Sequence, residues 1–169
     1  MHVENSLSED MPKIFDLYRI ATAYMKSKEQ VHWPEFSADL IRFEIETQRQ
    51  WKLVSNGEVA CVWATALSDA LIWGDKNEDP SLYIHRIAAN PDFRGQNLVK
   101  QLVAWADEYC KRKGLKYVRM DTVGFNEGLI GHYQKLGFDF LGSAPLENTD
   151  GLPDHYKAGP VCFFQREVK

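Results

Sequence analysis

A short loop between an expected strand and an expected helix carries residues that favour an anion. The segment NPDFRGQNLVKQLVAWADEYCKRKG, residues 90–114, runs from a turn-forming Asn-Pro-Asp through Arg94, Gly95, Gln96 and Asn97 into a helix. The first turn of a helix offers free N–H groups and a positive dipole end, which together favour phosphate. Gly95 lets the backbone approach closely, Asn97 tolerates a positive φ, and the Arg94 guanidinium supplies a fork of donors. On these residues alone, an ordinary helix start with a surface arginine is an equal alternative.

The elements around this loop form a strand–helix–strand unit. The run SLYIHRIAA, residues 81–89, is rich in β-branched and aromatic residues and predicts a strand. After the loop, apolar residues recur at helical spacing until Gly114, a residue type that commonly ends a helix. The run LKYVRMDTV, residues 115–123, predicts the second strand. Such a crossover implies two neighbouring parallel strands in one sheet.

The rest of the chain adds two helices and further strands. One helix is predicted from an Asp10 N-cap to about residue 30, and another from a Ser37 cap to about residue 48. Apolar runs flank Asn56-Gly57 and predict a β-hairpin, because both residues tolerate positive φ. The elements expected after the central unit are a helix from Asn126 to Gly137, a strand at 138–142, a loop at 143–160 and a strand at 161–168. This order predicts one mixed α/β domain over residues 1–169.

Composition limits the class of protein. The chain has 169 residues, 44% of them hydrophobic and 26% charged, which is the balance of a soluble globular protein with a sizeable core. A net charge of −4 without a basic run argues against nucleic-acid binding. The chain shows no secretory signal pattern and no apolar run of transmembrane length, so we expect no membrane partner. The three cysteines are widely spaced, which predicts no metal site, no disulfide framework and a cytoplasmic location.

Three consecutive pieces of the sequence together resemble the GNAT superfamily of acyl-CoA-dependent N-acetyltransferases. They are IHRIAANPDFRGQ, the following helix with the strand KYVRMDTV, and the terminal segment NEGLIGHYQKLGFDFLG. The pieces cover residues 81–142, and the helix–helix–hairpin order before them fits the same fold. The resemblance implies a mixed, mostly antiparallel sheet that is splayed at the cofactor site and flanked by helices. It also implies an acyltransferase that moves an acetyl group from acetyl-CoA to a primary amine.

The phosphate loop of this family reads Gln or Arg, two residues, Gly, one residue, then Gly or Ala. Arg94 matches the first position, whereas Asn97 stands where Gly is usual and Val99 where Gly or Ala is usual. Asn97 is a mild change, because Asn adopts positive φ more readily than other residues with a side chain. The branched side chain of Val99 is expected to crowd the pyrophosphate and to alter the affinity or the pose of the cofactor.

The resemblance also assigns roles to particular residues. The backbone of Ile87, Ala88 and Ala89 would hydrogen-bond the pantetheine arm, and one of these N–H groups would polarise the thioester carbonyl. Asn126 resembles a residue that contacts the cofactor, and Tyr133 resembles the general acid that protonates the leaving thiolate. In isolation Tyr133 would be interpreted as a core aromatic, but its spacing from Asn126 favours the catalytic role. The pyrophosphate would be held by the N–H groups of Arg94, Gly95, Gln96, Asn97, Leu98 and Val99.

The base that takes the proton of the amine is less defined by the sequence. His85 has a suitable unperturbed pKa, and strand alternation places it on the face opposite Ile84 and Arg86. A structural histidine is the alternative for this position, and an ordered water could replace a dedicated base. The acidic candidates near the expected acceptor cleft are Glu78, Asp79 and Asp121.

Loop residues are expected around the mouth that admits the acceptor. They serve either as acceptor contacts or as loop anchors, and they are Trp33, Phe36, Trp73 and Tyr156. His155 is expected to be solvent-exposed. The acceptor is a small-molecule or peptide amine of undetermined identity. A homodimer through the loop at 143–160 and the last strand is compatible with the sequence.

Two other functions remain open from the sequence. A non-catalytic acyl-CoA-binding or regulatory module could keep the same fold, and turnover distinguishes it from an enzyme. A dinucleotide or ATP site has no support, because the sequence lacks both GxGxxG and GxxxxGK[ST]. A phosphate-binding protein of unrelated chemistry is the second alternative.

Overall fold

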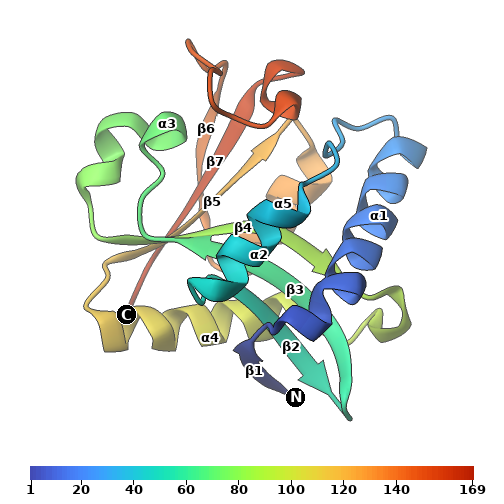
Figure 1. The fold of residues 1–169 in the computed structure, drawn as a ribbon. Coiled ribbons are helices and arrows are strands. Elements are labelled where there is room, and N and C mark those ends of the chain that lie inside the picture. The colour runs from blue at the N-terminus through green and yellow to red at the C-terminus, as the bar shows by residue number, and fades with distance from the viewer.

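A seven-stranded sheet forms the centre of the computed structural model, which describes residues 1–169 (Figure 1). The strand order is β1-β2-β3-β4-β5-β7-β6, and all neighbours are antiparallel except β4 and β5. The sheet is therefore mixed and mostly antiparallel, as the resemblance implied. The strands are β1 (His2–Asn5), β2 (Gln50–Ser55), β3 (Glu58–Ala66), β4 (Ser81–Ala89), β5 (Tyr117–Val123), β6 (Asp139–Ala144) and β7 (Val161–Glu167).

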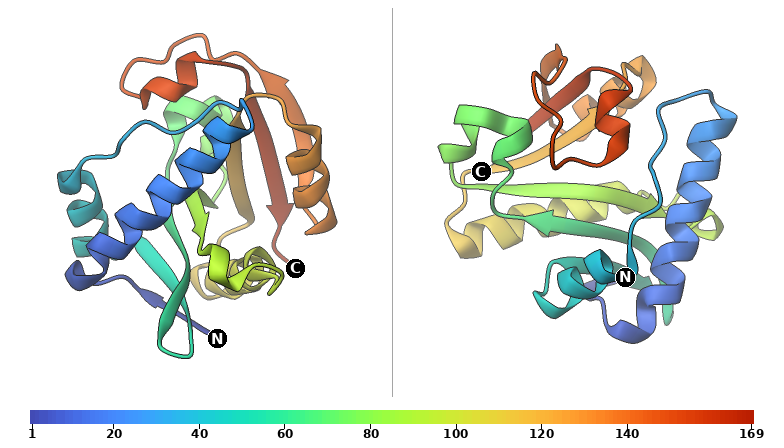
Figure 2. Two further views of the ribbon diagram at one scale, coloured as in Figure 1. Left: turned by 90° about the vertical axis from the view of Figure 1, so that its right-hand side faces the viewer. Right: turned by 45° about the horizontal axis from the view of Figure 1, so that its top comes forward.

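Helices cover both faces of this sheet, as Figure 2 shows. On one face, α4 and α5 enclose the largest core cluster, in which Leu102 and Ala106 are fully buried. On the other face, α1 and α2 pack through a smaller cluster that reaches Val62 of β3 and Ala88 of β4. The helices are α1 (Met11–Ser27), α2 (Ala38–Glu46), α3 (Ala70–Trp73), α4 (Leu98–Lys113) and α5 (Glu127–Lys135). None of them combines the length and the apolarity needed to cross a membrane.

Local sequence signals account for several element boundaries. Asn56 and Gly57 have φ of +52° and +80°, as the predicted hairpin between β2 and β3 requires. The Ser37 hydroxyl accepts a hydrogen bond from the Leu40 N–H at 3.2 Å and so caps α2 as predicted. Gly114 ends α4 in the left-handed conformation. The short elements β1 and α3 were not predicted.

Asp10 differs in its role from the expected N-cap. It precedes α1 as predicted, but its carboxylate makes no capping bond to that helix. The carboxylate instead accepts from the Leu7 N–H at 2.7 Å and pairs with Lys52 Nζ at 2.8 Å. Asp10 therefore ties the start of α1 to β2 rather than satisfying the first turn.

The parallel strands β4 and β5 separate halfway along their length. Their pairing runs from Ser81–Tyr117 to Ile84–Met120, although both strands continue beyond these residues. From His85 onwards, the side of β4 that faces β5 has no strand partner. This confirms the expected splay and exposes backbone groups at the centre of the sheet.

A β-bulge in β4 lies at the same point. The β3–β4 register places Ala64 opposite His85 and Val62 opposite Ala88, so β4 holds one extra residue. Arg86 takes up this extra length with a φ of +53°. The expected alternation is therefore wrong for Arg86, which lies with His85 on the face covered by α1 and α2 instead of with Ile84.

The last strand does not form an edge of the sheet. β7 lies between β5 and β6, so β1 and β6 are the edge strands. A homodimer through the loop at 143–160 and the last strand stays a prediction.

Candidate functional site

The loop before α4 presents unused backbone donors. Gly95 has a φ of +82° and Asn97 a φ of +53°, which turns the chain sharply into the helix. The N–H groups of Arg94 and Gln96 donate to the preceding turn, whereas no backbone carbonyl accepts from Gly95, Asn97, Leu98 or Val99. Four free donors at the positive end of a sixteen-residue helix form a site suited to pyrophosphate.

The two departures from the family's loop pattern fit this geometry. Asn97 occupies the left-handed conformation that glycine would adopt, so the loop keeps its shape. Val99 is partly buried against the main core cluster. The expected effect of Val99 on cofactor affinity stays a prediction. The Arg94 side chain is exposed beside the free donors.

The open side of β4 leads directly to this loop. Ala88 and Ala89 pair with Val62 and Cys61 of β3, so their contacts to the sheet lie on one side only. The backbone groups of Ile87, Ala88 and Ala89 that face β5 have no partner strand. A pantetheine arm needs such a row of unpaired backbone groups, and the residues present therefore fit acetyl-CoA.

Tyr133 lies in α5, on the face of the sheet that carries the main core cluster. Its ring packs against Phe164 of β7, with ring centroids 5.1 Å apart, and the residue is buried. Burial raises the pKa of Tyr133 to about 12, with the Cys61 thiol as a second cause, and no hydrogen bond contributes to the shift. The ring is thus a core aromatic, while the hydroxyl remains protonated and without a hydrogen-bond partner.

Asn126 is the N-cap of α5. Its Oδ1 accepts from the Leu129 N–H at 3.1 Å, which satisfies one donor of the first helical turn. The side-chain amide nitrogen is then the part of Asn126 that remains for a cofactor.

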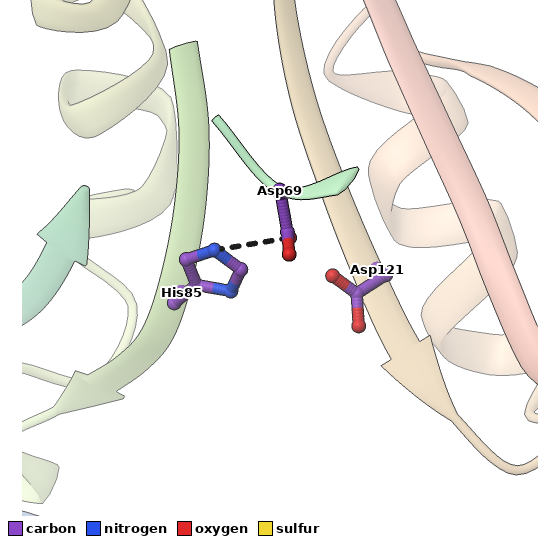
Figure 3. Close-up of side chains that lie close together, drawn as sticks. All are labelled: Asp69, His85 and Asp121. Carbon is purple, nitrogen blue, oxygen red and sulfur yellow. Dashed lines mark ion pairs between the residues drawn. The ribbon is translucent and has the colours of Figure 1, made fainter. Parts of the chain in front are cut away.

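His85 and Asp121 face each other where β4 and β5 separate. Each is the residue that follows the last parallel pair, Ile84–Met120, on its own strand. Figure 3 shows both side chains pointing into the gap, with the carboxylate of Asp69 between them. The distance from His85 Nε2 to Asp69 Oδ2 is 3.3 Å. The three residues each offer one ligand atom, and these atoms all lie within 4.8 Å of one another.

Asp69 was not singled out from the sequence. It precedes α3, where an aspartate usually caps the helix, but its carboxylate makes no capping bond. The Asp69 N–H instead donates to Asn77 Oδ1 at 2.6 Å, which holds the turn and directs the carboxylate toward His85. The only sequence signal was an aspartate at the start of a short apolar run.

Asp121 is held by the loop between β6 and β7. The Tyr156 hydroxyl donates to Asp121 Oδ2 at 2.6 Å. Burial raises the pKa of Asp121, although His85 and the Tyr156 hydrogen bond oppose that shift. The other oxygen, Asp121 Oδ1, and Asp69 Oδ2 are buried and receive no hydrogen bond from the protein.

Arg86 lies next to this cluster but is fully engaged. Its Nη2 donates to both carboxylate oxygens of Glu44, and its Nε donates to the Tyr18 hydroxyl at 3.3 Å. The guanidinium also lies 5.0 Å from the centre of the Phe36 ring. Trp33 and Phe36 pack edge-to-face on Tyr18, so these loop aromatics act as anchors.

The loop between β6 and β7 also brings His155 toward the site. His155 is partly buried rather than solvent-exposed, and its Nδ1 is buried without a partner. The pKa of His155 is lowered to about 4, first by burial and then by the charges of Arg86 and His32. Near neutral pH this imidazole is therefore uncharged.

The remaining candidates for the base lie elsewhere. Asp79 pairs with Arg119 at 2.8 Å, and this arginine is 1% exposed. Asp79 precedes His85 by six residues, which is about 20 Å along an extended strand. Glu78 is exposed at the same distant end of β4. Trp73 is buried against Tyr83 and Phe163 and anchors α3.

A family model described as "Acetyltransferase (GNAT) family" matches residues 16–138. The chain belongs to this family. It is 31% identical over 75 residues to the uncharacterized N-acetyltransferase YesJ of Bacillus subtilis, a match that covers 44% of this chain and 42% of YesJ. An uncharacterized N-acetyltransferase of Methanocaldococcus jannaschii is 39% identical over 56 residues, covering 33% of this chain and 25% of that protein. The chain thus matches less than half the length of these curated relatives.

Solved structures show the same fold. A GNAT-family acetyltransferase from Listeria monocytogenes superposes with a TM-score of 0.79 and 23% identity, covering 99% of this chain and 94% of that one. One from Streptococcus agalactiae has a TM-score of 0.77, 18% identity, and coverage of 99% and 95%. The N-acetylglutamate synthase of Neisseria gonorrhoeae, solved with coenzyme A and N-acetyl-glutamate, has a TM-score of 0.66, 16% identity, and coverage of 99% and 35%.

Proposed function

We propose that this protein transfers the acetyl group of acetyl-CoA to a primary amine. The observation that carries this proposal is the separation of β4 from β5 directly before the open start of α4. Along the chain, the bulge at Arg86 is followed by the unpaired backbone of Ile87–Ala89 and then by the free donors of the loop. This order follows the order of thioester, pantetheine and pyrophosphate in the cofactor.

The backbone of β4 is the part of the protein that would hold and polarise the thioester. A bulge turns consecutive peptide groups away from regular strand pairing, so that an N–H near Ile87 can point at the carbonyl oxygen. Donors that are fixed in place before the reaction stabilise the negative charge that develops there. The free N–H groups from Gly95 to Val99, together with the Arg94 side chain, would bind the pyrophosphate.

His85 and Tyr133 would manage the two protons of the transfer. The amine nitrogen forms a bond to the carbonyl carbon and gives up a proton to His85. The carbon–sulfur bond breaks, the electron pair stays on sulfur, and Tyr133 supplies the proton that makes the free thiol. Tyr133 suits this role because its pKa of about 12 keeps it protonated at neutral pH.

Calorimetry with acetyl-CoA, followed by a turnover assay, tests the proposal. We expect wild type and Tyr133→Phe to bind acetyl-CoA with similar affinity, and only wild type to release CoA efficiently with a panel of primary amines. Binding without turnover on any amine would identify a non-catalytic acyl-CoA-binding module. Absence of binding to wild type would refute the proposal altogether.

A further inference from the structure

Three hydrogen-bond acceptors converge at the point where β4 and β5 separate. They come from His85 on β4, Asp121 on β5 and Asp69 before α3 (Figure 3). Asp69 Oδ2 and Asp121 Oδ1 are both buried, and no protein group donates to either of them. Buried carboxylate oxygens are costly without a donor or a cation, so a donor or a cation bound at this point would stabilise them.

A primary ammonium ion matches this arrangement in number. It carries three N–H donors, one for each acceptor. The acceptor atoms all lie within 4.8 Å of one another, and His85 Nε2 and Asp69 Oδ2 are 3.3 Å apart, so one cation can contact all three. We propose that Asp69, His85 and Asp121 bind the acceptor of the acetyl transfer as its primary ammonium ion, and this inference rests on the proposed function.

The charges around the cluster define the class of acceptor. Asp69 and Asp121 form no ion pair with an arginine or lysine, and Arg86, which follows His85 on β4, is paired with Glu44. His155 is uncharged near neutral pH because its pKa is lowered to about 4. The cluster itself therefore holds no free cation that could pair with a carboxylate on the acceptor. The cluster selects amines that carry no carboxylate beside the reacting nitrogen and excludes α-amino acids.

The same residues provide a path for the proton. One ammonium N–H faces His85 Nε2. Transfer of that first proton to His85 and from there to solvent leaves a neutral amine with a free electron pair, and the neutral His85 then accepts the second proton during the attack. Asp69 lies 3.3 Å from His85 Nε2 and stabilises the imidazolium that forms. Asp69 and Asp121 are positioning residues. The Tyr156 hydroxyl holds the Asp121 carboxylate, and Asn77 Oδ1 accepts a hydrogen bond from the backbone N–H of Asp69.

Histidine NMR tests ammonium binding without any need for turnover. Protein labelled with ¹⁵N-histidine is titrated with n-pentylammonium, and the His85 signal is identified by its loss in His85→Gln. We expect a saturable shift of the His85 nitrogens with pentylammonium and none with N,N,N-trimethylpentylammonium, which has no N–H donor. Asp69→Asn and Asp121→Asn should weaken binding about tenfold to a hundredfold, as expected for loss of a charged hydrogen bond.

The controls separate this inference from protein folding and from the proposed function. Asp75→Asn, at an exposed aspartate, should bind pentylammonium like wild type, and all variants should retain acetyl-CoA binding by calorimetry. Equal shifts with the trimethyl compound, or no saturable shift, would overturn the ammonium site even where acetyl-CoA turnover is intact. A His85 shift produced by Zn²⁺ and not by pentylammonium would also overturn it and would identify a metal site. Turnover of norleucine as fast as of pentylamine would overturn the acceptor class.

Discussion

Replacement of Tyr133 by phenylalanine separates catalysis from folding in this protein. The ring packs in the main core cluster between α5 and β7, and phenylalanine keeps that ring. The hydroxyl makes no hydrogen bond that contributes to its pKa, so its removal breaks no interaction within the protein. The free energy of unfolding should therefore change by less than about 1 kcal/mol.

The expected effect on activity is far larger. A positioned general acid contributes about 10²- to 10⁴-fold to a rate, and phenylalanine has no proton to give to the departing sulfur. The value of kcat should fall within this range while the affinity for acetyl-CoA stays unchanged. With a thioester analogue whose thiol leaving group is more acidic, the fall in kcat caused by Tyr133→Phe should be smaller. The departing sulfur of this analogue needs less protonation by a general acid.

The same variant has a distinct signature in alkali. The pKa of Tyr133 is raised from 10.0 to about 12, so at high pH the unfolded chain loses this proton before the folded protein does. Stability from this residue is complete below pH 10 and declines as the pH rises toward 12, by about 3 kcal/mol in total. The Phe variant should lack this decline. The measurements for wild type and Tyr133→Phe are kcat, the affinity for acetyl-CoA by calorimetry, and the free energy of unfolding in urea at pH 8 and pH 11.

Two results would refute this reasoning. Activity of Tyr133→Phe within about threefold of wild type would show that water or another group protonates the thiolate. A loss of several kcal/mol of stability would show that the hydroxyl has a structural partner, and any loss of activity would then say nothing about acid catalysis.

Three further predictions concern the loop before α4, the bulge in β4 and the loop between β6 and β7. Arg94→Ala should weaken acetyl-CoA binding about tenfold in calorimetry, because the variant lacks the exposed guanidinium that would contact the phosphate. The effect should be smaller at high salt, and an unchanged affinity would show that Arg94 does not contribute to the site. Glu44→Ala should lower the free energy of unfolding, measured in urea, by about 3 kcal/mol, since it leaves Arg86 unpaired beneath α2. An unchanged free energy of unfolding would mean that Arg86 reaches solvent. The pKa of His155 is depressed to about 4, so its contribution to stability is present above pH 6.5 and is lost as the pH falls through 4. This loss amounts to about 2 kcal/mol for a partly exposed group, and His155→Gln should show a flatter stability curve over that range.

Signals that act within a few residues were readable from the sequence. The hairpin at Asn56-Gly57, the Ser37 cap and the Gly114 stop each depend on the conformational preference of one or two residues. The strand–helix–strand unit was predicted for the same reason, because β4, α4 and β5 follow one another without interruption. The loop at residues 94–99 is part of this unit, so the position of the proposed anion site was readable from the sequence as well. β1 and α3 were missed because each spans only four residues, too few to show a period.

The tertiary structure decided what surrounds the point where β4 and β5 separate. No pattern in SLYIHRIAA marks a bulge, and a positive φ is unfavourable for arginine, yet Glu44 and Tyr18 draw Arg86 to the face of His85. The cluster of Asp69, His85 and Asp121 joins residues from three separate elements, and only the fold brings them together. Local preferences therefore determined the elements and the loop before α4, whereas long-range packing determined which side chains gather where β4 and β5 separate.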